Sequence, residues 1–271
     1  MKQSNSNEAI HIGFPVDISQ SPYTRLARVI DDTLFAEFEY EWMMTQAERC
    51  LLIWLLEKIR PEVSIEIGTA GGGSLSVIAQ FSNEVFSIDP DPSCAERFRQ
   101  KFKNVKFLTG KSQVLLPSLL EEQCKIGKGP SFVLIDGAHQ REAVRQDICN
   151  LLKVQPTQPM WVIMHDSYNP GCRQGIIEGN WAENSYVHYV ELDFVPGRFN
   201  AETKEMWCGF AIALLLPFKR EHNLTIHKEH EVEFQTMVKI SAHQKRLGHT
   251  IRLAVREVVT KVIAKVVGVK S

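Results

Sequence analysis

The chain has 271 residues, of which 44% are hydrophobic and 23% are charged, and its formal net charge is −1. This composition is typical of a globular protein with a core in one large domain, and a charge near zero argues against nucleic acid as the main partner, because nucleic-acid binding usually uses a basic surface. The sequence has no run of about 18 apolar residues, no apolar leader and no closely spaced pair among its six cysteines, so we expect a cytoplasmic protein rather than a membrane, secreted or zinc-knuckle protein.

Residues 22–60 are expected to be mostly helical. The apolar residues of 46–60 recur at the spacing of one helix face, and Pro61 then ends the helix. We therefore predict an N-terminal helical or lid segment over residues 1–45, ahead of a central domain over residues 46–220.

Apolar strands and helices alternate after this point. The predicted strands cover residues 63–67, 85–88, 105–108, 132–135 and 161–164. The predicted helices between them cover about 74–81, 93–102, 113–123 and 139–153. Continuous apolar strands separated by helices indicate a parallel sheet that is covered on both faces. Two further strands, 186–192 and 207–216, are expected to close the sheet edge as an antiparallel hairpin. The predicted fold class is α/β, Rossmann-like and doubly wound, with a mostly parallel seven-stranded sheet.

Residues 221–271 form a predicted C-terminal extension. Between residues 242 and 271, seven Lys or Arg residues stand against one Glu, and apolar residues recur at helical spacing. This pattern predicts a basic amphipathic helix that packs on its own domain or on a second subunit. The alternatives are an anchor to a membrane surface or an acidic partner, and a disordered tail. We expect a homo-oligomer.

A glycine-rich turn follows the first strand of the sheet. The strand ends near Glu66, the turn runs from Gly68 to Gly73, and a helix begins near Ser74. Glycines allow a tight turn and close approach of a ligand to the backbone, and a helix N-terminus offers free N–H groups. By itself this turn is compatible with a dinucleotide, with another nucleoside ligand, or with no ligand.

Two later strand ends add polar residues at the same sheet edge. Asp89 follows the second strand at a spacing from Gly68 that is typical of nucleoside-binding units, where a carboxylate can accept hydrogen bonds from both ribose hydroxyls. A turn-forming role before Pro90 is the alternative. Ser112 follows the third strand and predicts either a contact beside an adenine ring or a plain turn.

The fourth and fifth strands end in acids and histidines. Asp136 and His139 follow one strand, and His165 and Asp166 follow the other. Because ligand sites in such sheets lie outside the carboxyl ends of the strands, we expect these four residues to converge. They would form either an acid–base set or a hard-cation site. Oxygen ligands suit Mg²⁺ or Mn²⁺, and a histidine ligand shifts the preference toward Mn²⁺ or a later metal.

These motifs resemble those of class I S-adenosylmethionine-dependent methyltransferases over about residues 42–216. They are E-x-G-x-x-x-G-x-S, an acid after the second strand, G-x-S after the third and D-G-x-H after the fourth. The similarity is strongest to metal-dependent O-methyltransferases that act on the sugars of macrolide antibiotics, with cephalosporin hydroxylase-like proteins as relatives. It implies methyl transfer from S-adenosylmethionine to a hydroxyl of a glycosyl or other small-molecule acceptor.

The resemblance also implies a role for each residue. The residues expected along the methionine and ribose part of the cofactor are Glu66, Gly68, Thr69, Gly72 and Ser74. Asp89 would take the ribose hydroxyls, and Ser112 would lie near the adenine. Asp136 would border the cofactor and be the first metal ligand, His139 would be the general base, and His165 with Asp166 would complete a site for Mg²⁺ or Mn²⁺. His165 stands where the family has a carboxylate, which leaves the metal and its identity open.

The acceptor and the reaction class have alternatives. Candidate acceptor contacts lie in residues 10–45 and in the loops 167–184 and 193–206. The aromatic and arginine residues of these loops, which could equally be core residues, are Tyr168, Arg173, Trp181, Phe194, Arg198 and Phe199. Other readings are a catechol-type or carboxyl methyltransferase, a metal-dependent hydroxylase-like or dehydrogenase-like protein, and a non-catalytic binding protein.

Overall fold

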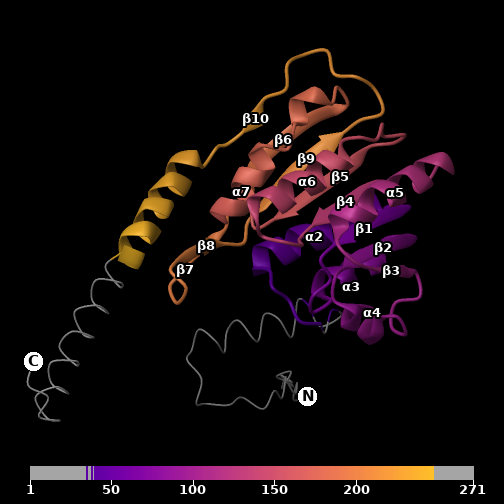
Figure 1. Ribbon diagram of the computed structural model, residues 1–271, viewed down its shortest axis with the longest axis horizontal. Helices are drawn as coiled ribbons and strands as arrows, with labels where there is room; N and C mark the ends of the chain where they lie inside the picture. Colours follow the sequence, from indigo (N-terminus) through magenta and orange to yellow (C-terminus); the bar gives the residue numbers. More distant parts are fainter. Residues whose placement is uncertain (1–34, 36–37, 39, 247–271) are drawn as a thin grey trace, which may run out of the picture. The chain divides into compact units, whose positions relative to one another are not determined.

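The computed structural model describes residues 35, 38 and 40–246 (Figure 1). The chain divides into two units, Met1–Glu39 and Tyr40–Ser271. The helices expected between residues 22 and 34, and the tail from residue 247, lie outside the described residues.

Residues 40–45 are not helical, which corrects the sequence prediction for this stretch. Glu41 forms an isolated parallel bridge with Gly72, and its carbonyl accepts a hydrogen bond from the Gly73 N–H at 3.2 Å. Helix α2 (Gln46–Ile59) begins only after Thr45, because a capping box between Thr45 and Glu48 fixes its first turn.

The centre of the fold is an eight-stranded sheet in the order β10-β6-β9-β5-β4-β1-β2-β3. Its parallel strands are β1 (Val63–Ile67), β2 (Glu84–Asp89), β3 (Val105–Thr109), β4 (Phe132–Ile135) and β5 (Met160–His165). The connecting helices are α3 (Gly73–Phe81), α4 (Pro92–Phe98), α5 (Ser112–Lys125) and α6 (Arg141–Leu151). Strands β1 and β4 are buried along their whole length, as expected for a sheet covered on both faces. The predicted Rossmann-like α/β fold is confirmed.

The antiparallel part of the sheet is more elaborate than predicted. Strand β9 (Phe210–Leu215) pairs antiparallel with both β5 and β6 (Val187–Val195), and the two-residue strand β10 (Ile226–His227) adds an eighth member. The predicted strand 207–216 is broken at Cys208 and Gly209, which both have positive φ, 64° and 89°. A separate hairpin of β7 (Arg198–Asn200) and β8 (Glu205–Trp207) precedes this break.

The expected loop 167–184 contains helix α7 (Pro170–Ile177) and a 3-10 turn, η1 (Trp181–Glu183). Asn169 caps α7 by accepting the Gly171 N–H at 2.9 Å, and Pro170 occupies the first turn, where its missing N–H costs nothing. Helices α5, α6 and α7 pack side by side, as α2 and α3 do (Figure 1).

A helix over residues 231–246 follows β10. Its Phe234 packs in a small cluster with Tyr168 and Met206, so the described beginning of the C-terminal extension rests on the central domain. None of the described helices is long and apolar enough to cross a membrane.

Candidate active site

A cavity of about 850 Å³ lies at the carboxyl ends of the parallel strands. Residues from five consecutive positions of the sheet edge border it: Ser112 beyond β3, Asp89 on β2, Gly68 after β1, Asp136 after β4, and His165 with Asp166 at the end of β5. A cavity of this volume accommodates a ligand of cofactor size. The structure therefore brings together predicted residues that are up to about a hundred positions apart in the chain.

Gly68 is the point where the turn after β1 meets β4. Its φ is +93°, and a Cβ built there would lie 2.0 Å from the carbonyl oxygen of Asp136. The Asp136 N–H in turn donates to the carbonyl of Ile67 at 2.8 Å. Only glycine fits both the backbone conformation and this close approach.

Asp89 shapes the glycine turn as well as bordering the cavity. Its Oδ2 accepts hydrogen bonds from the backbone N–H groups of Thr69 at 2.8 Å and Ala70 at 3.4 Å. Its Oδ1 accepts from the Asp91 N–H at 2.8 Å. Asp89 thus combines the turn-forming role with a position suited to a ligand hydroxyl.

Glu66 lies beneath the turn and does not border the 850 Å³ cavity. It is fully buried, and its carboxyl oxygens accept hydrogen bonds from Ser74 at 2.7 Å and Ser87 at 2.9 Å. Burial, only partly offset by these serine hydroxyls, raises the pKa of Glu66 to about 8. Thr69, Gly72 and Ser74 border a neighbouring cavity of about 20 Å³.

Ser112 begins α5 at the far end of the large cavity. The Gln113 amide donates to Ser112 Oγ at 3.0 Å and to Asp147 Oδ2 at 2.9 Å. Burial raises the pKa of Asp147 to about 6, against the lowering effect of its own hydrogen bonding with Ser112 and Gln113. These hydrogen bonds hold Ser112 and Gln113 in the cavity wall, where the resemblance places the adenine ring.

The four predicted acids and histidines converge in a network of ion pairs. His165 Nδ1 lies 2.8 Å from Asp136 Oδ1 and 3.6 Å from Asp166 Oδ2. His139 Nε2 lies 3.0 Å from the same Asp166 oxygen. His165 and Asp166 are buried, whereas the His139 side chain is 46% exposed, so His139 is the member that a ligand in the cavity can reach most easily.

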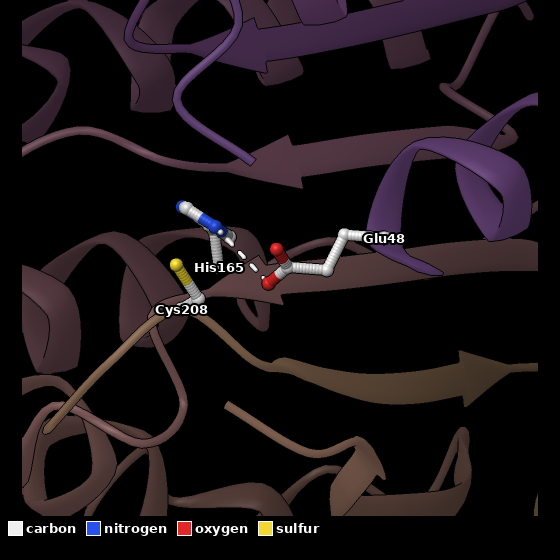
Figure 2. A group of neighbouring side chains, drawn as sticks. All are labelled: Glu48, His165 and Cys208. Carbon is white, nitrogen blue, oxygen red and sulfur yellow. Dashed lines mark ion pairs between the residues drawn. The ribbon is translucent and has the colours of Figure 1, made fainter. Parts of the chain in front are cut away.

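Glu48, on α2, is a further member of this network, and the sequence patterns did not predict it. Its Oε1 lies 3.2 Å from His165 Nε2 and accepts the Gly209 N–H at 2.5 Å; its Oε2 accepts the Thr45 N–H at 2.5 Å. Figure 2 shows the carboxylate reaching from the helix toward the imidazole. The sequence does contain a signal for this role: Glu48 is an acid on the apolar face of a helix, one turn before Leu52. An acid in such a buried position almost always has a partner.

The network fixes the charge of its members. Burial acts to lower the pKa of His165, but the negative charge of Asp136 and its hydrogen bond raise that pKa well above the ordinary histidine value. Burial acts to raise the pKa values of Glu48 and Asp166, but their histidine partners lower both. The Asp166 hydrogen bond raises the pKa of His139. Paired in this way, charged groups can remain buried.

Two non-glycine residues of the site adopt left-handed backbone conformations, Asp166 with φ 56° and Cys208 with φ 64°. They are tied together, because the Cys208 N–H donates to Asp166 Oδ1 at 2.6 Å and the Tyr168 N–H donates to the Cys208 carbonyl at 3.0 Å. Such conformations persist only where the surrounding structure holds them.

The predicted metal ligands offer the types of donor atom that a divalent cation binds. Donor atoms of Asp136, His165 and Asp166 all lie within 4.8 Å of one another. Two carboxylates suit a hard ion such as Mg²⁺ or Mn²⁺. His165 Nδ1 is already hydrogen-bonded to Asp136, so the two carboxylates are the donors that an oxygen-seeking ion would use first.

The β7–β8 hairpin forms the outer wall of the cavity through Arg198 and Trp207. His139 packs edge-on against Trp207 with ring centroids 5.3 Å apart, and Trp207 Nε1 donates to Glu205 at 3.2 Å. Of the six aromatic and arginine candidates for acceptor contacts, Arg198 alone borders this cavity.

The buried positions of three of those candidates explain why they do not reach the cavity. Tyr168 packs against Phe234, Arg173 bonds Asp193 at 2.7 Å, and Trp181 Nε1 donates to a backbone carbonyl at 2.6 Å. The geometry therefore favours a role for these three residues in the protein core rather than in acceptor binding.

Residues 65–167 match a family model described as a methyltransferase domain. This stretch contains all eleven predicted site residues but neither Glu48 nor Cys208. This match confirms the resemblance to methyltransferases for residues 65–167. No curated protein matches the chain.

Several solved structures are similar to the chain at low identity. A cofactor-bound protein from MTB, Rv0187, is 16% identical, with 74% of this chain and 92% of that chain covered and a TM-score of 0.47. An O-methyltransferase from Bacillus cereus in complex with SAH is 15% identical, with 74% and 93% covered and a TM-score of 0.47. The O-methyltransferase TomG from Streptomyces achromogenes is 17% identical, with 73% and 91% covered and a TM-score of 0.48.

Proposed function

We propose that the chain is an S-adenosylmethionine-dependent O-methyltransferase that acts on a hydroxyl of a small molecule, with a sugar as the preferred acceptor class. One observation carries this proposal: a single cavity joins the glycine turn and Asp89 at one end to the His139–Asp166 pair at the other. The methyltransferase-domain match over residues 65–167 supports it.

The cofactor would occupy the part of the cavity along β1, β2 and β3. Asp89 would accept hydrogen bonds from the ribose hydroxyls, and Gly68 would let the backbone approach the methionine part. The Ser112 wall would lie beside the adenine. This placement directs the methyl-bearing sulfur toward Asp136 and His139, because β4 is the next strand of the sheet edge.

The reaction needs alignment and the removal of one proton. S-adenosylmethionine, when bound, would supply a methyl group that its positive sulfur already activates, so the chain has to align the acceptor hydroxyl with that group. His139 holds its Nε2–H toward Asp166, which leaves Nδ1 to take the hydroxyl proton. Asp166 stabilises the imidazolium that forms. Trp207 packs against the His139 ring and restricts its rotation.

A divalent ion would be held by Asp136 and Asp166, with His165 assisting. When bound, such an ion lowers the cost of forming an alkoxide from a weakly acidic sugar hydroxyl. The remaining expectations stay predictions: a cytoplasmic homo-oligomer, and a basic helix over residues 242–271 that packs on its own domain or on a second subunit, with contact to a membrane surface or an acidic partner as the alternative.

Calorimetric titration with S-adenosylhomocysteine, with and without Mg²⁺ or Mn²⁺, tests the cofactor. We expect saturable binding near one per chain. Asp136→Asn should retain that binding and lose methyl transfer to a panel of sugar and phenol acceptors, and His139→Gln should behave in the same way. Absence of cofactor binding in every condition would overturn the proposal, and full activity of Asp136→Asn would exclude the metal-assisted step.

A further inference from the structure

The two nitrogens of His165 face different sets of donor atoms. Nδ1 makes a 2.8 Å hydrogen bond with Asp136. Nε2 is buried and makes no hydrogen bond, although it lies 3.2 Å from Glu48 Oε1. Cys208 lies beside the imidazole as well, and donor atoms of Glu48, His165 and Cys208 come within 4.8 Å of one another (Figure 2).

These three side chains offer one nitrogen, one oxygen and one sulfur ligand. The three donor atoms all lie within 4.8 Å of one another, and all three residues are buried. Zinc binds Cys, His and carboxylate ligands at about 2.0–2.3 Å in tetrahedral geometry, which places two such ligands roughly 3.3 Å apart. The 3.2 Å separation between His165 Nε2 and Glu48 Oε1 already matches that spacing.

The conformation of Cys208 indicates that its side chain has a role beyond packing. The residue has φ 64°, where glycine is the favoured occupant, and the neighbouring Gly209 has φ 89°. A hydrogen bond from its own N–H to Asp166 holds it there. Strained non-glycine residues cluster at functional sites because the structure around them must over-determine the strain.

We propose that Glu48, His165 Nε2 and Cys208 bind zinc, with the fourth coordination position open toward the cavity. His165 and Cys208 both border that cavity, and three protein ligands with one open position are typical of zinc sites that bind water or substrate. The thiolate makes the site selective for a thiophilic ion, whereas Mg²⁺ requires oxygen ligands.

Asp136 then acts outside the zinc ligands. Its carboxylate accepts the Nδ1–H of His165, so the proton that zinc displaces from the imidazolium is the one on Nε2, and the Nε2 lone pair then binds the ion; a carboxylate in this position is found behind many histidine ligands of metals. With zinc bound, His165 no longer assists the proposed Mg²⁺ or Mn²⁺ ion, which Asp136 and Asp166 would then hold without it. The zinc site itself needs neither cofactor nor acceptor, so its binding of zinc can be tested separately from methyl transfer.

Titration of the metal-free full chain with Co²⁺, followed by competition with Zn²⁺, tests this site. We expect one tight ion per chain and the near-ultraviolet charge-transfer absorption of a cobalt–thiolate bond. Cys208→Ser should remove that absorption and weaken zinc binding by about 100-fold or more. Asp136→Asn should keep the absorption and lose about 10–100-fold in affinity, as changes to the partners of metal ligands do.

Cys172→Ser is the matched control, because Cys172 is also buried but donates to the His139 carbonyl and does not belong to the group of ligand residues around His165. It should retain both the absorption and the affinity. Persistence of the thiolate absorption in Cys208→Ser, or its absence from wild-type protein with normal circular dichroism, would overturn the zinc site. Binding of S-adenosylhomocysteine, measured on the same samples, reports separately on the proposed function.

Discussion

The sheet edge has two halves that are built in different ways. The half at β1, β2 and β3, here called the cofactor half after its proposed ligand, is made mainly of backbone turns and of partners close in the sequence. Asp89 and Thr69, whose N–H donates to it, are 20 residues apart. The acid half, at β4, β5 and β9, is made of buried side chains from distant segments. Glu48 and Gly209, which bond each other there, are 161 residues apart.

The difference shows what each half tolerates. A backbone turn fails when a side chain is added where there is no room, whereas a charge network fails when one charge is removed and its partner stays buried. Substitutions in the cofactor half should therefore affect ligand binding first, and substitutions in the acid half should affect stability first.

The largest expected effect comes from Gly68→Ala, where the two halves meet. The new Cβ would lie 2.0 Å from the Asp136 carbonyl at a φ of +93°, so the turn and β4 must separate. We expect calorimetry to show at least about a 100-fold loss of S-adenosylhomocysteine affinity. Gly127→Ala is the control, since it has φ +72° and nothing within 4 Å; equal losses in both variants would show that backbone strain, not the contact with β4, is responsible.

Glu48→Gln tests the acid half by removing one charge without removing its atoms. His165 would keep a buried positive charge with one carboxylate fewer, and we expect the free energy of unfolding to fall by about 3–5 kcal/mol in urea denaturation. Affinity for S-adenosylhomocysteine should change little. Glu57→Gln, on the exposed side of the same helix, should stay within about 0.5 kcal/mol of wild type. A similar small loss for Glu48→Gln would mean that the network is not charged.

Glu66, buried beneath the glycine turn, should make the stability of the protein depend on pH. Its pKa is raised from 4.5 to about 8 in the folded protein, so between these values the folded state holds a proton that the unfolded state has lost. Stability should therefore fall as pH rises through this window, by up to about 1.4 kcal/mol per pH unit. Glu66→Gln should flatten the slope in urea denaturation measured from pH 5 to 8; an unchanged slope would assign it to other groups.

The smallest expected effect concerns the outer wall of the acid half. Lys245, on the helix over residues 231–246, pairs with Glu205 of the β7–β8 hairpin at 2.5 Å, and both side chains are substantially exposed, 49% and 37%. Lys245→Gln should lower the unfolding free energy by less than about 1 kcal/mol. A loss above 2 kcal/mol would show that this pair, rather than the cluster around Phe234, holds the hairpin on the helix.

The cofactor half could be predicted almost entirely from the sequence, because each of its residues directly follows an apolar strand and its partners are close in the chain. The convergence of Asp136, His139, His165 and Asp166 was also predictable, since the topology of a parallel sheet places strand ends together. The roles of Glu66 and Arg173 were harder to predict. Glu66 is buried among serines and Arg173 is paired with acids, and sequence spacing does not reveal such side-chain packing.

Glu48 and Cys208 escaped prediction for a related reason. Both act through contacts with residues far away in the sequence, and Cys208 lies at a break within a stretch that reads as one continuous strand. The outer wall of the cavity likewise depends on the β7–β8 hairpin, whose strands have three residues each and are too short to show alternation.

The strand order also determines which parts of the sheet can form first while the polypeptide is being synthesised on the ribosome. Strand β6 is synthesised before β9, yet its neighbours in the sheet are β9 and β10, both of which emerge later. Until β9 inserts beside β5, the strand β6 has no sheet partner and Glu48 has no Gly209 to bind. The nascent chain can thus complete its glycine turn early, but it completes the buried ion-pair network around His165 only when β9 closes the sheet.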